Sequence, residues 1–422
     1  MKRHPIFGNP LPAGWSSMTV DEVKSPDKHA CVAGPFGSDI SSKYFAESGV
    51  PVIRGSNLRD DLTRFVPEGF VFVSPERALK YKGQHVKGDD LVFTCWGTVG
   101  QVGIIPKNGP FEEYIISNKQ LKLRVDPMIA NPLFVFYHLA NPVATAYIRN
   151  RAIGAAVPGI NLGILKALPL ALPSRSAQDK IVEVLAAYDD LIENNARRIA
   201  ILEDLIRFLY RNWFDSHAGA DSCSPTGWSF LELEELVDER RYSVDPRELD
   251  PMLPYFGLEH LPRRSIALNT WGVAGDVQSS KLRATSGDIL FGKIRPYFHK
   301  VGVCPFDAVC SSDTIVLRVK RPENFGLVLA CVSSDAFVAH ATQTSQGTKM
   351  PRANWKILRR YPVAVPPAVL YTAFNTQVSQ SVGLIQHLVL KNANLHATRD
   401  FLLPKLISGE LDVSQLPGAE AT

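Results

Sequence analysis

The chain has 422 residues and a formal net charge of +4, with hydrophobic residues at 45% of positions and charged residues at 21%. This length exceeds one ordinary hydrophobic core, so two or three domains are expected. No run approaches 18 apolar residues and the first residues lack an apolar signal stretch, which predicts a cytoplasmic protein with no membrane contact. Six cysteines without a C-x-x-C pair favour reduced thiols over disulfides or bound zinc.

Residues 1–175 are strand-rich. Short β-type runs alternate with Gly, Pro and Asn turns, as in VPVIRG (50–55), DDLVFTCW (89–96) and KQLKLRV (119–125). A helical pattern over 131–150 follows, and the region closes on Pro158, Asn161, Leu165, Pro169 and Pro173. This pattern predicts a mixed domain of strands and helices.

Residues 176–215 are expected to form a long helix. Between Gln178 and Phe214 there is no Pro or Gly, and apolar residues recur at alternating intervals of four and three. They are Ile181, Leu185, Tyr188, Ile192, Ile199, Leu202, Ile206, Leu209 and Trp213, with the polar Asn195 at the remaining position. Such a heptad pattern is typical of a coiled coil. A core helix of an ordinary domain is the alternative, but a helix of about 55 Å would be as long as a whole domain.

Residues 216–368 repeat the first domain. LPAGW (11–15) recurs as SPTGW (224–228), GDDLVF (88–93) as GDILF (287–291), and VGI (102–104) as VGV (301–303). The closing series recurs as Pro351, Asn354, Leu358, Pro362 and Pro366, each 193 positions later (for example 351 − 158). We therefore infer a duplicated unit, in which Asn161 and Asn354 are expected to cap a turn or helix.

Residues 369–413 are expected to form the second long helix, and 414–422 a tail. Its apolar series is Phe374, Val378, Ile385, Leu388, Leu395, Leu402 and Leu406, interrupted by Ser381, Asn392 and Arg399. Because only this helix can cover the first, the two are expected to pair antiparallel about a pseudo-two-fold axis. That arrangement would set Asn195 opposite Asn392 and Ile199 opposite Leu388, and a buried amide pair would fix the register.

The predicted fold is therefore α+β, with two tandem mixed domains joined by two long antiparallel helices in a pseudo-two-fold coiled coil. The residues expected to pair the helices are Ile181, Leu185, Ile192, Asn195, Ile199, Leu202, Ile206, Leu209, Ile385, Leu388, Asn392, Leu395 and Leu402.

At this point the motifs resemble a known family. GPFGSDI (34–40), VPVIRGSNL (50–58), GDDLVFTCWGTVGQVGII (88–105) and GAAVPGINLGILKALPLALPS (154–174) resemble a type I restriction–modification target-recognition domain. YFGLEHL (255–261), GDILFGKIRPYFHKVGVC (287–304), CSSDTIVLR (310–318) and GTKMPRANWKILRRYPVAVPP (347–367) resemble a second such domain, and FLLPKLISGELDV (401–413) resembles the end of the family's second conserved helix.

The resemblance implies a specificity subunit that carries no catalytic site, cofactor or metal. In this family each recognition domain reads one half of a split double-stranded DNA target, and the helices set the gap. Two methylation subunits with S-adenosylmethionine and two restriction subunits with ATP and Mg²⁺ are the implied partners.

Base readout requires Arg, Lys, amide or hydroxyl side chains at a groove, with further basic residues on phosphates. In the second domain the candidates are Lys281, Arg283, Lys293, Arg295, Tyr297, Lys300, Thr348, Lys349 and Arg352. In the first they are Lys43, Arg54, Ser56, Asn57, Thr94, Trp96, Thr98, Asn118 and Lys119. The alternative for each is a solvated basic strand face or a turn residue.

Two other functions are considered. NPLF (131–134) resembles the loop with which adenine methyltransferases hold a flipped base, but its second proline is missing and no Gly-rich cofactor loop precedes it. We interpret it as a proline near a helix start. The other alternative is a coiled-coil scaffold with no role in DNA recognition. Any DNA binding by such a basic scaffold would be electrostatic and would be lost for all sequences together as salt rises, whereas a specific reader would keep a sequence preference.

Overall fold

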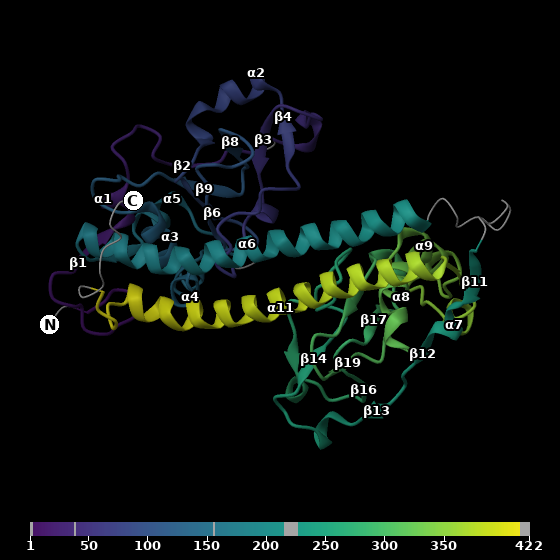
Figure 1. Cartoon of the computed structure of the whole chain (residues 1–422). Helices are drawn as coiled ribbons and strands as arrows, with labels where there is room; N and C mark the ends of the chain where they lie inside the picture. The colour runs from purple at the N-terminus through teal and green to yellow at the C-terminus, as the bar shows by residue number, and fades with distance from the viewer. Residues whose placement is uncertain (1–2, 38, 155–156, 215–226, 414–422) are drawn as a thin grey trace. The chain divides into compact units, whose positions relative to one another are not determined.

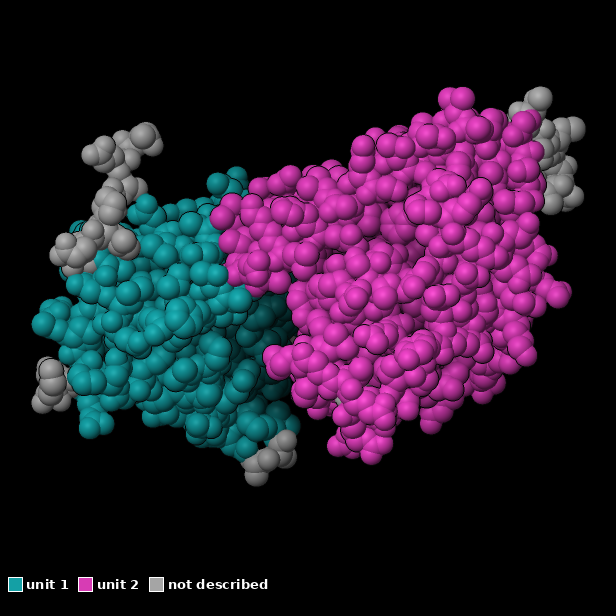
Figure 2. Space-filling view, turned by 60° about the horizontal axis from the view of Figure 1, so that its bottom comes forward, with its two compact units in different colours: residues 1–190, 396–422 teal, residues 191–395 magenta. Residues whose placement is uncertain are grey.

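The computed structural model describes the chain except residues 1–2, 38, 155–156, 215–226 and 414–422. The start of SPTGW and the predicted tail therefore lie outside the described residues. The chain divides into two compact units, unit 1 with residues 1–190 and 396–422, and unit 2 with residues 191–395 (Figure 2). Each unit contains one strand-rich region and a part of each long helix.

Unit 1 contains two four-stranded sheets and a two-stranded one. The first sheet has the order β2 (Cys31–Ala33), β9 (Gln120–Leu123), β6 (Leu91–Thr94), β7 (Val102–Ile104) and is antiparallel throughout. The second has the order β4 (Val71–Val73), β3 (Val50–Ile53), β8 (Tyr114–Ile116), β5 (His85–Val86), with β3 and β8 parallel. β1 (Ser16–Thr19) pairs with β10 (Pro169–Leu172). The α-helices are α1 (Val20–Val23), α2 (Pro75–Ala78), α3 (Pro132–Ala140), α4 (Pro142–Arg149) and α5 (Leu162–Lys166).

Unit 2 repeats this topology, with one strand more in its second sheet. Its first sheet has the order β12 (Val237–Glu239), β20 (Thr314–Val319), β17 (Ile289–Gly292), β18 (Val301–Val303). Its second has the order β13 (Ser243–Val244), β16 (Lys281–Ala284), β19 (Ala308–Cys310), β14 (Pro254–Phe256), β15 (Gly272–Val273), with β14 and β19 parallel. β11 (Ser229–Glu232) pairs with β21 (Pro362–Val365), and the α-helices are α7 (Leu233–Leu236), α8 (Phe325–Val332), α9 (Asp335–Gln343) and α10 (Trp355–Leu358).

The repeat predicted from the sequence is present in the fold. Both units carry a parallel pair inside an otherwise antiparallel second sheet. Asn161 begins α5 and Asn354 begins α10, and in each case the asparagine side chain accepts a hydrogen bond from a backbone N–H of the helix. The expectation that these two asparagines are caps is confirmed.

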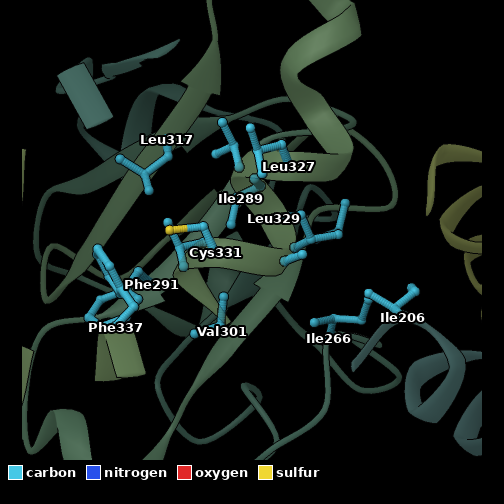
Figure 3. Close-up of a cluster of buried hydrophobic side chains, with 14 of the residues drawn as sticks. Ile206, Ile266, Ile289, Phe291, Val301, Leu317, Leu327, Leu329, Cys331 and Phe337 are labelled. Carbon is cyan, nitrogen blue, oxygen red and sulfur yellow. The ribbon is translucent and has the colours of Figure 1, made fainter. Parts of the chain in front are cut away.

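The core of each unit lies between its first sheet and its helices. In unit 2 the side chains of Ile289, Phe291 and Leu317 from the sheet meet those of Leu327, Leu329, Cys331 and Phe337 from α8 and α9 (Figure 3). Every residue from Gly326 to Val332 is buried. The α8 helix is apolar on all sides because it has no solvent face.

Within the described part of the chain no single helix is long and apolar enough to cross a membrane. One bent pair, Pro322–Val332 with Asp335–Gln343, meets that criterion by length and composition. Five cysteines are free thiols, and Cys223 lies outside the described residues.

The two long helices are α6 (Arg175–Phe214) and α11 (Ala368–Ile407), each of 40 residues (Figure 1). α11 ends six residues before the predicted limit of 413. Gly409, in the left-handed conformation with φ +75°, reverses the chain there, and the N–H groups of Ser408 and Gly409 bond to the last turn. Glycine at this position is the usual end of a helix.

Within unit 2 the two helices run antiparallel. Phe374 near the start of α11 contacts the rings of Trp213 and Phe214 at the end of α6. Asn392, further along α11, accepts a hydrogen bond from Asn195 Nδ2 at 2.8 Å and donates one to the Ile192 carbonyl at 3.1 Å. Ile199 and Leu388 belong to the same buried cluster.

The contribution of the Asn195–Asn392 hydrogen bond to the free energy of unfolding can be measured. We expect Asn392→Leu to lower the free energy of unfolding of unit 2 by about 1–3 kcal/mol, because the buried amide of Asn195 loses its acceptor. Asn195→Leu combined with Asn392→Leu should recover most of that loss, since no polar group is then left unpaired. Urea unfolding of the two single variants and the double variant measures the coupling, and additive losses would contradict it.

Candidate nucleic-acid interface

In unit 1 a groove of about 720 Å³ collects most of the predicted DNA contacts. It is formed by the loop after β2, the end of β3, the end of β6 and the turn between β8 and β9. Seven of the nine predicted residues line it: Arg54, Ser56, Thr94, Trp96, Thr98, Asn118 and Lys119. The tertiary structure therefore brings together residues from three separate stretches of sequence.

Hydrogen bonds hold the walls of this groove. Gln101 Oε1 accepts from the hydroxyls of Thr94 at 3.1 Å and Thr98 at 2.6 Å, and Asn118 Nδ2 donates to the Gly37 carbonyl at 2.9 Å. Trp96 is 42% exposed and lies over Gly159, where a Cβ would stand 2.5 Å from the indole ring. These bonds hold polar side chains in fixed positions beside an exposed aromatic face, and hydroxyl and amide side chains are among those that contact bases.

Two predicted contacts of unit 1, Lys43 and Asn57, lie outside the groove lining, and a third, Thr94, lines it but is buried. Asn57 is fully buried, and its side chain accepts from the Arg54 N–H and donates to the Val66 and Glu68 carbonyls. These three hydrogen bonds stabilise a turn, and the buried side chain does not face solvent. Thr94 is 2% exposed, and Lys43 is exposed but lies outside the groove lining, with its ammonium 4.6 Å from the Tyr44 ring.

In unit 2 the predicted contacts come from two loops that are tied together. The Arg295 N–H donates to the Pro351 carbonyl at 2.7 Å, and the Ala353 N–H donates to the Lys293 carbonyl at 2.9 Å. Unit 1 has the matching bond, from the Ile160 N–H to the Cys95 carbonyl at 3.0 Å. The loop with Thr348, Lys349 and Arg352 is thus held against the end of β17.

The exposed members of this set are Arg283, Tyr297, Thr348, Lys349 and Arg352. Tyr297 is 50% exposed and packs edge-on against Phe298. Arg295 is half-buried and has φ +50°, an uncommon conformation for a side chain other than glycine. Arg352 Nη2 lies 3.4 Å from Asp313 Oδ1, which orients the guanidinium at the loop.

The ammonium groups of three lysines of the predicted set donate hydrogen bonds to oxygen atoms of this chain. Lys281 is 6% exposed and its ammonium donates to Ser279, while Lys293 donates to the Ser312 carbonyl at 3.0 Å. Lys300 donates to the Leu258 carbonyl. Burial lowers the pKa of Lys293 and of Lys300. These bonds tie the three lysines to the strands beside the loops. Lys281 is buried and Lys293 and Lys300 are half-buried, and their role as DNA contacts stays a prediction.

Sequence reasoning missed other polar residues at these surfaces. Ser41 and Ser42 line the groove of unit 1. In unit 2, Arg240, Arg241 and Tyr242 line a separate groove with Arg283. The adjacent arginines of ERRYS (239–243) were the available signal, but only the fold places them beside Arg283, because β13 pairs with β16.

The methyltransferase-like NPLF segment is a helix start. Asn131 caps α3, accepting from the N–H groups of Leu133 and Phe134, and Pro132 occupies the first helical turn. The interpretation of this motif as a proline near a helix start is confirmed. Among the described residues, no group of three or more His, Cys, Asp or Glu could hold a metal ion.

Comparisons with known proteins agree with one another. Residues 37–204 match the family model described as "Type I restriction modification DNA specificity domain". The type I restriction enzyme MjaIX specificity subunit of Methanocaldococcus jannaschii is 23% identical over 338 residues, which cover 74% of this chain and 72% of that protein. The EcoDI specificity subunit of Escherichia coli is 24% identical over 325 residues, covering 65% and 71%.

A solved structure shares the fold. The S subunit of a type I restriction–modification system from M. genitalium superposes with a TM-score of 0.59 at 15% identity, covering 97% of this chain and 98% of that one. The likeness of fold therefore extends along almost the whole of both chains.

Proposed function

We propose that this chain, which is similar to specificity subunits of type I restriction–modification systems, reads one half of a bipartite double-stranded DNA target with each of its two units. The chain is the DNA-recognising component of such a system and not its catalytic one. The observation that carries the proposal is the groove of unit 1, where seven residues predicted to contact DNA converge on one surface.

The long helices support a fixed gap between the half-sites. Each has 40 residues, which corresponds to about 60 Å, and a rigid spacer gives two reading surfaces a defined separation where a flexible linker would not. We propose that the helix-pairing residues predicted from the sequence serve this spacing.

The partners follow from the family. The chain acts with other subunits of the system, and we propose two methylation subunits that supply S-adenosylmethionine chemistry and two restriction subunits that use ATP and Mg²⁺. Its own contribution is to place a DNA target before those subunits.

The experiment that tests this function maps methylated adenines in DNA exposed to the full chain with its methylation partner. We expect a single split target with a constant gap. Methylation without sequence preference, or methyl transfer by the purified chain alone, would contradict the proposal.

Variants of one unit should change one half-site. We expect Asn118→Ala with Lys119→Ala to relax the readout of one half, at about 1–3 kcal/mol of discrimination for each base that is no longer read, and Thr348→Ala with Lys349→Ala to relax the other. The control is Lys107→Ala, an exposed lysine outside the groove. If either pair of substitutions relaxes both half-sites together, the assignment of one unit to each half is wrong.

A further inference from the structure

A groove of about 510 Å³ in unit 2 is lined by four arginines. They are Arg240, Arg241, Arg283 and Arg318, and the remaining lining residues are Glu239, Tyr242 and Thr285. The groove lies where β12, β13, β16 and β20 come together, and it is separate from the loop that carries Thr348, Lys349 and Arg352.

Two of these arginines are neutralised by the protein. Arg318 binds the buried Asp288 carboxylate through two nitrogens, at 2.7 and 2.8 Å, and Arg241 Nε donates to Glu239 at 2.6 Å. Arg240 and Arg283 are exposed and have no ion-pair partner among the described residues. The groove therefore presents two uncompensated positive charges to solvent.

The backbone holds these two arginines in place. The Arg240 N–H donates to the Val316 carbonyl at 2.8 Å, and the Arg283 N–H donates to the Tyr242 carbonyl at 2.9 Å. Tyr242 lies between them in this network and is 65% exposed. Two guanidinium groups and a phenol on fixed strands form a preorganised set of donors for an anion with several oxygen atoms.

We propose that this arginine groove binds the phosphodiester backbone of the DNA whose bases unit 2 reads. The proposal rests on the function proposed above. Phosphate contacts from Arg and Tyr position a protein on the duplex without reading its sequence, and uncompensated exposed arginines suit that role better than base readout.

The position of the groove along β20 supports this partner. Thr314, at the start of β20, pairs with Gly292 beside the reading loop, and Arg318 lies at the groove. At about 3.3 Å per residue the strand covers about 13 Å between them, close to the roughly 12 Å width of the DNA major groove. Strands β13 and β16 are drawn on the side of unit 2 away from α11 (Figure 1).

The test compares Arg240→Ala/Arg283→Ala with the wild-type chain, each with its methylation partner. Affinity for target and mismatched duplexes is measured between roughly 50 and 200 mM salt. We expect the slope of log K against log salt to fall by about 1.8, or 0.9 for each phosphate contact. Affinity should fall equally for both duplexes, with the mapped target unchanged. Arg240→Lys/Arg283→Lys should restore most of the slope.

A matched control removes the same charge elsewhere. Lys356→Ala/Arg360→Ala removes two exposed cations outside the groove that also have no ion-pair partner among the described residues, and it should leave the slope closer to wild type. An unchanged slope in the groove variant would overturn the proposal, as would a loss of methylation-partner binding with the slope intact. A wild-type complex without target preference would instead refute the proposed function.

Discussion

Asp189→Ala is expected to lower the free energy of unfolding of unit 1 by about 3–5 kcal/mol, the usual cost of removing one partner from a buried ion pair. Arg399 is 3% exposed, and its Nη1 lies 2.7 Å from Asp189 Oδ1. Tyr137 donates its hydroxyl to the same carboxylate at 2.5 Å. Burial lowers the pKa of Arg399, but the Asp189 and Asp400 carboxylates together outweigh burial and raise that pKa.

The neighbouring aspartate is the matched control. Asp190 is 66% exposed and pairs with Arg64 at 2.7 Å, so Asp190→Ala should cost less than about 1 kcal/mol. Thermal or urea unfolding compares the two variants. Asp189→Ala combined with Arg399→Met should be more stable than Asp189→Ala alone, because the single variant leaves the buried Arg399 paired only with Asp400, which is 55% exposed. Equal losses from Asp189→Ala and Asp190→Ala would contradict this account.

Glu203→Ala is expected to destabilise unit 2 by about 3 kcal/mol. Glu203 is 6% exposed on α6, and its Oε1 accepts from the Ser265 hydroxyl at 2.6 Å and from the N–H groups of Ile266 and Ala267 at 2.7 and 3.1 Å. Removing the carboxylate leaves buried donors unpaired, at about 1–3 kcal/mol each before relaxation.

Two variants separate this effect from a general loss of helix stability. Glu203→Gln keeps an acceptor oxygen and should lose less than Glu203→Ala. Asp204→Ala removes a carboxylate that is 75% exposed and should change stability by about 0.5 kcal/mol or less. The rate of hydrogen exchange at the Ile266 and Ala267 N–H groups should rise only in the Glu203 variants. An unchanged exchange rate at these two groups in Glu203→Ala would refute the role of these bonds.

The two units attach to their parts of the long helices by different chemistry. Unit 1 uses a buried carboxylate between a tyrosine and an arginine, whereas unit 2 uses a carboxylate that caps backbone N–H groups. Both carboxylates lie on α6. The duplicated sequence thus keeps one topology while its polar attachments have diverged.

Much of the fold could be predicted from the sequence because it depends on local patterns. The 193-residue repeat, the long helices and the strands at 50–55, 89–96 and 119–125 follow from periodicity and turn residues. The asparagine caps and the helix start at NPLF follow from local hydrogen bonding.

The sequence by itself therefore determined the duplicated α+β architecture, because periodicity and capping act between residues close in the chain. Tertiary structure alone decided which polar residues face solvent: it buried Asn57 and Lys281, placed Asp189 against Arg399, and set Arg240 in one groove with Arg283. The physical reason is that burial, charge compensation and groove formation depend on strands and helices far apart in sequence, whose partners no local pattern specifies.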